Sequence, residues 1–295
     1  MTGGISRSEL LRTLLGEDKC HVMPCCWDAL SARMIEAAGF PFTFMSGFAV
    51  SASRIGAPDT GLLSYGEIVD QGRNICAAVG IPVIGDGDTG YGNALNVERT
   101  VRGYAQAGFA AVMIEDQLWP KRCGHTRGKR VVDRAEAFDR IAAAVHARDQ
   151  IGGGILILAR TDARAMHGLD EAIARAQRFR ELGADILFVE APGDETEMAR
   201  ITREVAGIHM ANMVEGGTTP ILPPARLHEL GYRFAAYPLT LLSAAMRAMK
   251  ESLSEFAVGR HPAGHTLDFA ELRRIVGFDD YYAAEERYAS DRRDD

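Results

Sequence analysis

The sequence predicts an α/β protein of the (β/α)₈ barrel class, of the TIM type. Short β-branched apolar runs alternate with longer amphipathic stretches, which is typical of parallel strands joined by helices. The alternation repeats eight times within about 240 residues, which is the number of units that closes a barrel. An open doubly wound sheet is the alternative, but no G-x-G-x-x-G follows the first apolar run. We expect a barrel over residues 1–260 and a helical tail over 261–295, which belongs to the same domain or to an oligomer contact.

The eight expected strands are short apolar runs. Several of them are followed directly by a polar or charged residue. Their ranges are 21–24, 42–45, 82–85, 111–114, 155–159, 186–189, 209–213 and 234–237.

A helix is expected after each strand. Asp28, Ser64 and Asp133 are suitable N-caps, and a glycine stops most of the helices. Residues 46–63 are expected to form a long loop of small residues. The helix ranges are 28–38, 64–79, 96–107, 133–148, 169–182, 195–205, 224–230 and 241–257.

Composition excludes several classes of function. The chain has 295 residues and a net charge of −7, so nucleic acid and anionic membranes are poor partners. Its five cysteines are irregularly spaced without a zinc pattern, which favours a reducing cytoplasm. No apolar stretch has the length of a signal peptide or of a membrane span.

Polar residues gather at the C-terminal ends of the expected strands, which meet at the catalytic face of a barrel. Any one of them could be a helix cap or a solvated loop residue, but together they indicate a site. They are Ser46, Gly47, Asp86, Asp88, Glu115, Asp116, Arg160, Asp162, Glu190, Asn212 and Thr240.

Four carboxylates, on Asp86, Asp88, Glu115 and Glu190, directly follow apolar strands. Unpaired carboxylates that converge would repel each other and raise their pKa values. A hard divalent cation relieves that repulsion, and oxygen ligands suit Mg²⁺ or Mn²⁺ better than zinc. We therefore expect Mg²⁺, with Mn²⁺ as a substitute.

A cation beside Arg160 would receive an anionic substrate. The Arg160 guanidinium can bind a carboxylate through two hydrogen bonds, and the tight turn at Ser46 and Gly47 offers backbone N–H groups. The alternative for Arg160 is a structural ion pair with Asp162 or Glu190.

The segment 121–125 lies in a long loop after the fourth strand. Its sequence, KRCGH, places Cys123 between basic residues, which lower a thiol pKa and permit proton transfer. The loop resembles a lid. The alternative is an incidental loop thiol.

Several segments together resemble the isocitrate lyase/phosphoenolpyruvate mutase superfamily, over about residues 8–254. KRCGH is typical of its carbon–carbon lyase branch, since the mutase and decarboxylase branches lack the cysteine. The segments are DGDTGYG at 86–92, IEDQ at 114–117, KRCGH at 121–125, ARTDA at 159–163 and VEAP at 189–192.

This resemblance implies a Mg²⁺-dependent homotetramer, a dimer of dimers, whose eighth helix is exchanged between subunits. Asp86 would hold the metal directly, and Asp59, Asp88 and Glu115 mainly through water. One end of a di- or tricarboxylate substrate would contact Ser46, Gly47 and Asp88. Its other end would contact Gly124, His125, Arg160, Glu190 and Asn212, with Phe48 and Leu239 also beside the substrate.

The implied reaction is cleavage of a 2-alkylmalate to an α-keto acid and a carboxylate. Cys123 would donate the final proton, and Arg160, His125 and Gly124 would stabilise the carbanion; no base is assigned. Residues 119–129 and 212–220 resemble the group of the petal death protein, 2,3-dimethylmalate lyase and oxaloacetate hydrolase. Hydrolysis of oxaloacetate to oxalate and acetate is the alternative, followed by 2-methylisocitrate cleavage, phosphonopyruvate-type chemistry and a non-catalytic binding protein.

Overall fold

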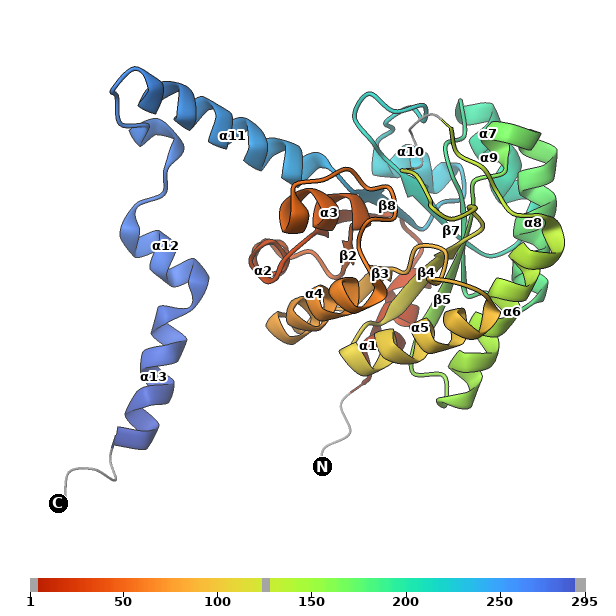
Figure 1. Cartoon of the computed structure of the whole chain (residues 1–295), viewed down its shortest axis with the longest axis horizontal. Helices are drawn as coiled ribbons and strands as arrows, with labels where there is room; N and C mark the ends of the chain where they lie inside the picture. The colour runs from red at the N-terminus through yellow and green to blue at the C-terminus, as the bar shows by residue number, and fades with distance from the viewer. Residues whose placement is uncertain (1–4, 124–127, 290–295) are drawn as a thin grey trace. The chain divides into compact units, whose positions relative to one another are not determined.

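The computed structural model describes residues 5–123 and 128–289. Eight parallel strands form a closed barrel in sequence order, with β8 paired to β1 (Figure 1). This barrel confirms the predicted fold class. The strands are β1 (His21–Cys26), β2 (Thr43–Met45), β3 (Val83–Asp86), β4 (Ala111–Glu115), β5 (Leu156–Thr161), β6 (Ile186–Val189), β7 (Ile208–Asn212) and β8 (Phe234–Tyr237).

Helices connect the strands. The expected helix starts at Asp28, Ser64 and Asp133 are confirmed, because each side chain accepts a hydrogen bond from the backbone N–H three residues further on. The helices from the N-terminus to the last strand are α1 (Arg7–Leu15), α2 (Ala29–Ala37), α3 (Gly47–Ile55), α4 (Tyr65–Ala78), α5 (Ala94–Ala107), α6 (Arg134–Gln150), α7 (Arg164–His167), α8 (Leu169–Glu181), α9 (Glu195–Glu204) and α10 (Pro224–Glu229).

The expectation of a loop over residues 46–63 is wrong in its first half, where α3 forms. Ser46 caps this helix by accepting a hydrogen bond from the Ala49 N–H at 3.3 Å. Gly56 ends it in the left-handed conformation at a φ of 62°. The helix begins with Gly47 and contains Ser51 and Ser53, residue types that favour loops and caps over helix interiors.

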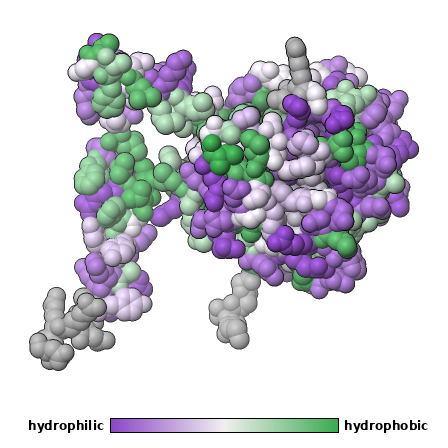
Figure 2. Space-filling view, viewed as in Figure 1, coloured by the Kyte–Doolittle hydropathy of each residue, from purple (hydrophilic) through white to green (hydrophobic). Residues whose placement is uncertain are grey.

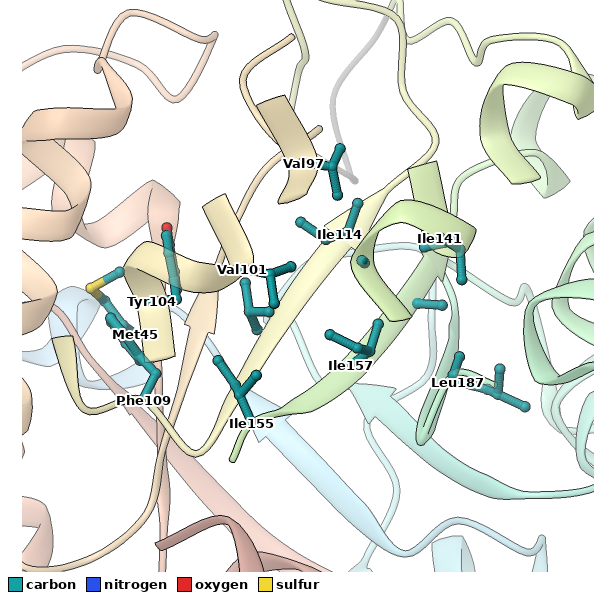
Figure 3. Close-up of a cluster of buried hydrophobic side chains, with 14 of the residues drawn as sticks. Met45, Val97, Val101, Tyr104, Phe109, Ile114, Ile141, Ile155, Ile157 and Leu187 are labelled. Atoms are coloured by element: carbon teal, nitrogen blue, oxygen red, sulfur yellow. The ribbon is translucent and has the colours of Figure 1, made fainter. Parts of the chain in front are cut away.

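Apolar side chains pack in two layers. Inside the barrel, Met23, Phe42, Ile84 and Phe234 belong to one buried cluster. A second cluster lies between the strands and the surrounding helices, where Val101 and Tyr104 of α5 pack towards β3, β4 and β5 (Figure 3). The two layers fix the barrel frame from which the site residues project.

The chain divides into two compact units, Met1–Leu241 and Leu242–Asp295. The second unit contains most of α11 (Thr240–Ala257), the short 3₁₀ helix Ala263–His265, α12 (Phe269–Val276) and α13 (Phe278–Ala289). Many of its large apolar side chains are exposed, as Figure 2 shows in green. The expected division into 1–260 and 261–295 remains a prediction. No helix within the described ranges is long and apolar enough to cross a membrane.

Candidate active site

Asp86 lies at the end of β3, and backbone N–H groups hold both oxygens of its carboxylate. Oδ1 accepts from the Asp88 N–H at 3.0 Å, and Oδ2 accepts from the Gly47 N–H at 3.2 Å. Gly47 is the first residue of α3, so the positive end of the helix also favours the Asp86 anion. A Cβ on Gly47 would lie 2.5 Å from Asp86 Oδ2, so this approach requires glycine. Here the expected Ser46–Gly47 turn contacts a carboxylate of the protein itself.

Lys121 is a buried cation beside these carboxylates, and sequence reasoning did not select it as a site residue. Its Nζ lies 2.6 Å from Asp59 Oδ1 and 2.7 Å from Asp88 Oδ1. Burial raises the pKa of Asp88 to about 7; the Lys121 charge opposes this shift, whereas Asp86 and Asp59 add to it. Burial acts to lower the Lys121 pKa, but Asp88, Asp59, Asp86 and Glu115 raise it well above its ordinary value. Lys121 is therefore a charged ammonium at neutral pH.

The acidic residues expected to bind metal are found near one another, and their chemistry fits a hydrated divalent cation. Asp59, Asp86 and Glu115 line one pocket, and Lys121 bridges Asp59 to Asp88. Glu115 Oε1 is buried and accepts no hydrogen bond from the described residues. In the part of the chain that the structure describes, no three such side chains are arranged to hold an ion by themselves. Mg²⁺ is commonly held by one or two carboxylates with water completing its shell, so this donor set fits it.

Arg160 forms the ion pairs with Asp162 and Glu190 that were the alternative to a substrate-binding role. It also lines the pocket. Its Nε lies 2.7 Å from Asp162 Oδ2 and 3.3 Å from Glu115 Oε2, and its Nη2 lies 3.1 Å from Glu190 Oε2. Asn212 Nδ2 donates to the same Glu190 carboxylate at 3.3 Å. These contacts fix the plane of the guanidinium.

A second network of carboxylates, formed by Asp162 and Asp116, holds Arg160 in place. Asp162 accepts from Arg160 and, at 2.8 Å, from Lys129 Nζ. Burial would raise the Asp162 pKa, but the two cations lower it to about 2. Asp116 in turn holds Asp162, accepting from its backbone N–H at 2.9 Å and from Arg175 at 3.0 Å. Asp116 and Asp162, which the strand-end pattern had grouped with the site, thus act as its scaffold.

One pocket collects most of the expected site residues, with a free volume of about 60 Å³. Cys123 lines it and is partly exposed, whereas the other four cysteines are buried. The expected residues Gly124 and His125 lie outside the described residues. The lining comprises Phe44, Ser46, Phe48, Asp59, Asp86, Met113, Glu115, Lys121, Arg122, Cys123, Arg160, Phe188, Glu190, Met210, Asn212, Val214, Ala236, Pro238 and Leu239.

The pocket floor is part of the barrel core. Phe44, Met113, Phe188, Met210 and Ala236 line the pocket and also belong to the buried cluster inside the barrel. None of these five residues was assigned to the site from the sequence, since an apolar residue near a strand end looks like any other core residue.

The family model described as phosphoenolpyruvate phosphomutase matches residues 11–257. The chain belongs to this family. It is 42% identical over 285 residues to 2,3-dimethylmalate lyase from Eubacterium barkeri, covering 96% of this chain and 98% of that protein. It is 43% identical over 285 residues to the chloroplastic carboxyvinyl-carboxyphosphonate phosphorylmutase of Arabidopsis thaliana, covering 94% and 83%. A solved structure of oxaloacetate acetylhydrolase with 3,3-difluorooxalacetate superimposes with a TM-score of 0.92 at 32% identity, covering 97% and 98%.

Membership of the phosphoenolpyruvate phosphomutase family confirms the resemblance drawn from the sequence motifs. The relatives in this family include lyases and a mutase, so the protein is an enzyme. The roles of the individual site residues remain predictions.

Proposed function

We propose that the protein is a lyase that depends on a divalent metal and cleaves the carbon–carbon bond of a 2-hydroxy dicarboxylate. The substrate is a 2-alkylmalate such as 2,3-dimethylmalate, and the products are an α-keto acid and a carboxylate. One observation carries the proposal: the Cys123 thiol lines the same pocket as Asp86, Glu115 and Arg160. In the sequence resemblance, KRCGH with this cysteine implies the carbon–carbon lyase branch, and the similarity to 2,3-dimethylmalate lyase supports the same assignment.

The metal would be held by Asp86 directly and by Asp59, Asp88 and Glu115 mainly through water. Mg²⁺, or Mn²⁺ in its place, supplies Lewis-acid stabilisation of the substrate oxygens. The carboxylate cluster favours the cation because it concentrates negative charge in a buried place.

The reaction breaks one carbon–carbon bond and involves two proton transfers, one from the C2 hydroxyl and one to C3. The C2 hydroxyl loses its proton, the C2–C3 bond breaks, and its electrons pass to C3 as a carbanion conjugated with the carboxylate. Arg160, with Gly124 and His125, stabilises this dianion, and Cys123 donates the proton to C3. Glu190 orients Arg160 and Asn212 at that end of the site. The base for the hydroxyl is not assigned.

The substituents of the substrate would lie against the apolar lining. Phe44, Phe48 and Leu239 line the pocket without offering a charged partner. A third carboxylate there would lose its hydration without compensation, which favours an alkyl group over the extra carboxylate of 2-methylisocitrate.

The decisive assay is pyruvate release from 2,3-dimethylmalate with Mg²⁺. We expect EDTA to abolish turnover by the wild type. We expect Cys123→Ala to turn over at least about 100-fold more slowly than the wild type, since a positioned proton donor contributes on this scale. The matched control is Cys76→Ala, which removes a buried thiol that is not part of the pocket lining. Cleavage by Cys123→Ala at the wild-type rate would exclude the proton-donor role.

Oxaloacetate hydrolysis is the second candidate, because the superimposed acetylhydrolase has the same fold at 32% identity. Hydrated oxaloacetate carries a hydroxyl at C2 in the place of the malate hydroxyl. Oxalate release from oxaloacetate would favour this reaction over alkylmalate cleavage, and phosphonopyruvate turnover should be negligible.

We also propose that the enzyme is a cytoplasmic homotetramer in which α11 is exchanged between paired subunits. The exposed apolar side chains of α11, among them Met249 and Leu253, support an interface on this helix.

A further inference from the structure

We propose that Gln117 is a positioning residue: its side-chain amide fixes the main chain that enters Cys123. The catalytic part of this inference rests on the proposed function, in which Cys123 donates a proton. The structural part rests on contacts among described residues alone.

The Gln117 amide pairs with both backbone groups of Arg122. Its Oε1 accepts from the Arg122 N–H at 3.0 Å, and its Nε2 donates to the Arg122 carbonyl at 2.8 Å. Gln117 is fully buried whereas Arg122 is exposed, so these two bonds tie an exposed loop residue to a side chain held in the interior. The arrangement fixes the peptide groups on either side of Arg122, one of which leads into Cys123.

We call these two hydrogen bonds between the Gln117 amide and the Arg122 backbone the clamp. The backbone of Gln117 anchors the other end of this clamp to the barrel. Arg140 Nη1 donates to the Gln117 carbonyl at 2.8 Å and to the Glu115 carbonyl at 3.2 Å. The Leu118 N–H donates to the Arg130 carbonyl at 2.8 Å. Gln117 therefore moves with the end of β4, the strand that carries Glu115.

The clamp fixes the orientation of the peptide planes at Arg122, which the neighbouring ion pairs of Lys121 do not. Lys121 also ties this segment to the site through Asp59 and Asp88, but its four-carbon side chain leaves the peptide plane free to rotate. The two bonds of Gln117 set that plane. Gln117 thus places the thiol at a fixed position relative to the acidic cluster.

Gln117→Glu tests the proposal, because it keeps the size and Oε1 but turns the amide donor into an oxygen facing the Arg122 carbonyl. The matched control is Gln71→Glu, which removes a similar amide bond, 2.9 Å to the Trp27 carbonyl, away from the pocket lining. We measure alkylation of Cys123 by iodoacetamide in the whole protein, with the buried cysteines as internal standards. We expect the rate to rise about threefold or more in Gln117→Glu, as for loss of one buried hydrogen bond, and to stay unchanged in Gln71→Glu.

The turnover assay adds a second readout. We expect kcat to fall about tenfold in Gln117→Glu while KM and the Mg²⁺ affinity stay at their wild-type values, since a misplaced donor slows only proton transfer. Wild-type alkylation and wild-type kcat together would overturn the proposal. If no malate is cleaved by the wild type, the proposed function fails, but alkylation still decides whether the clamp positions the thiol.

A measurement on the unaltered protein covers the case in which Gln117→Glu does not fold. Hydrogen exchange at the Arg122 amide should be slowed at least about tenfold relative to an unstructured peptide, because its N–H is bonded to a buried acceptor. Exchange at the unstructured rate would refute the clamp.

Discussion

At Asp162, one buried carboxylate faces two cations, Arg160 and Lys129. Replacing it by Asn would leave both cations without their shared counter-charge. We expect Asp162→Asn to lower the free energy of unfolding by about 3 kcal/mol, as for a broken buried ion pair. Urea denaturation measures this change. Asp170→Asn, which removes an exposed Asp–Arg pair with Arg200, should leave the midpoint nearly unchanged; equal losses in the two variants would contradict the argument.

The same carboxylate predicts a pH dependence. The Asp162 pKa is lowered from 3.8 to about 2 in the folded protein, so its stabilising contribution is complete above its ordinary pKa. The contribution is lost as the pH falls through the folded pKa. We therefore expect the stability difference between wild type and Asp162→Asn to be constant above about pH 5 and to shrink below about pH 4. Urea titrations at several pH values test the sign.

Gly47 is the residue whose missing side chain orients Asp86. In Gly47→Ala, the new Cβ would displace the Asp86 carboxylate, whose Oδ2 lies 2.5 Å from that position. If Asp86 is the direct metal ligand, Mg²⁺ or Mn²⁺ affinity should fall about 10-fold or more, as when ligand-orienting contacts are lost. Calorimetric titration measures it. Gly154→Ala is the control, since a Cβ there meets nothing within 4 Å; unaltered affinity in Gly47→Ala would show that Gly47 does not position Asp86 for metal binding.

Single residues also show where sequence reasoning stopped. The carboxylates were predictable because each directly follows an apolar strand, and the structure places them near one pocket. Lys121 and Gln117 were not assigned roles, because their partners Asp59, Asp88 and Arg122 are set by the path of a loop. No periodic pattern encodes that path.

At the scale of one element, α11 displays a row of apolar side chains. Met246, Met249 and Leu253 follow helical spacing and are 55%, 57% and 66% exposed. If this face is the proposed subunit interface, Leu253→Glu should yield particles of lower mass by light scattering on a sizing column. Arg247→Glu alters a charge on the same helix outside this apolar patch and should keep the wild-type mass. A wild-type mass for Leu253→Glu would argue against this face as the interface.

Elements with a clear boundary signal, such as an N-cap or a polar residue after an apolar run, were the ones that the sequence predicted well. The strand at 186–189 and the helix starts at Asp28 and Ser64 agree with the structure. Helix α3 was missed because its residues are small and its start depends on a single Ser46 cap. That helix supplies the Gly47 N–H that donates to Asp86, so the missed element contacts a candidate site residue directly.

The barrel closes where its last strand, β8, pairs with its first, β1. Phe234 of β8 is fully buried, packs edge-to-face on Phe42 at 5.9 Å between ring centroids, and lies in register with His21. We expect Phe234→Ala to lower the free energy of unfolding by about 3–5 kcal/mol through the cavity it creates. Urea denaturation measures it, with the exposed Leu95→Ala as control. A loss equal to that of Leu95→Ala would show that this contact does not hold the barrel closed.

The architecture of the whole molecule was predictable because eight repeated units leave few ways to pair parallel strands. Strand order and closure followed from that repetition alone. The division at Leu241 and Leu242 was not predictable, because α11 continues across it without a break in sequence pattern.

Substrate specificity and stability are coupled in this protein, because some side chains both line the pocket and fill the barrel interior. Phe44, Phe188 and Met210 line the pocket while they also fill the barrel interior. A substitution of one of them by a smaller residue, which would admit a bulkier substrate, also creates a cavity in the core. New specificity in this scaffold should therefore arise together with compensating substitutions elsewhere, or through loop residues that leave the core intact.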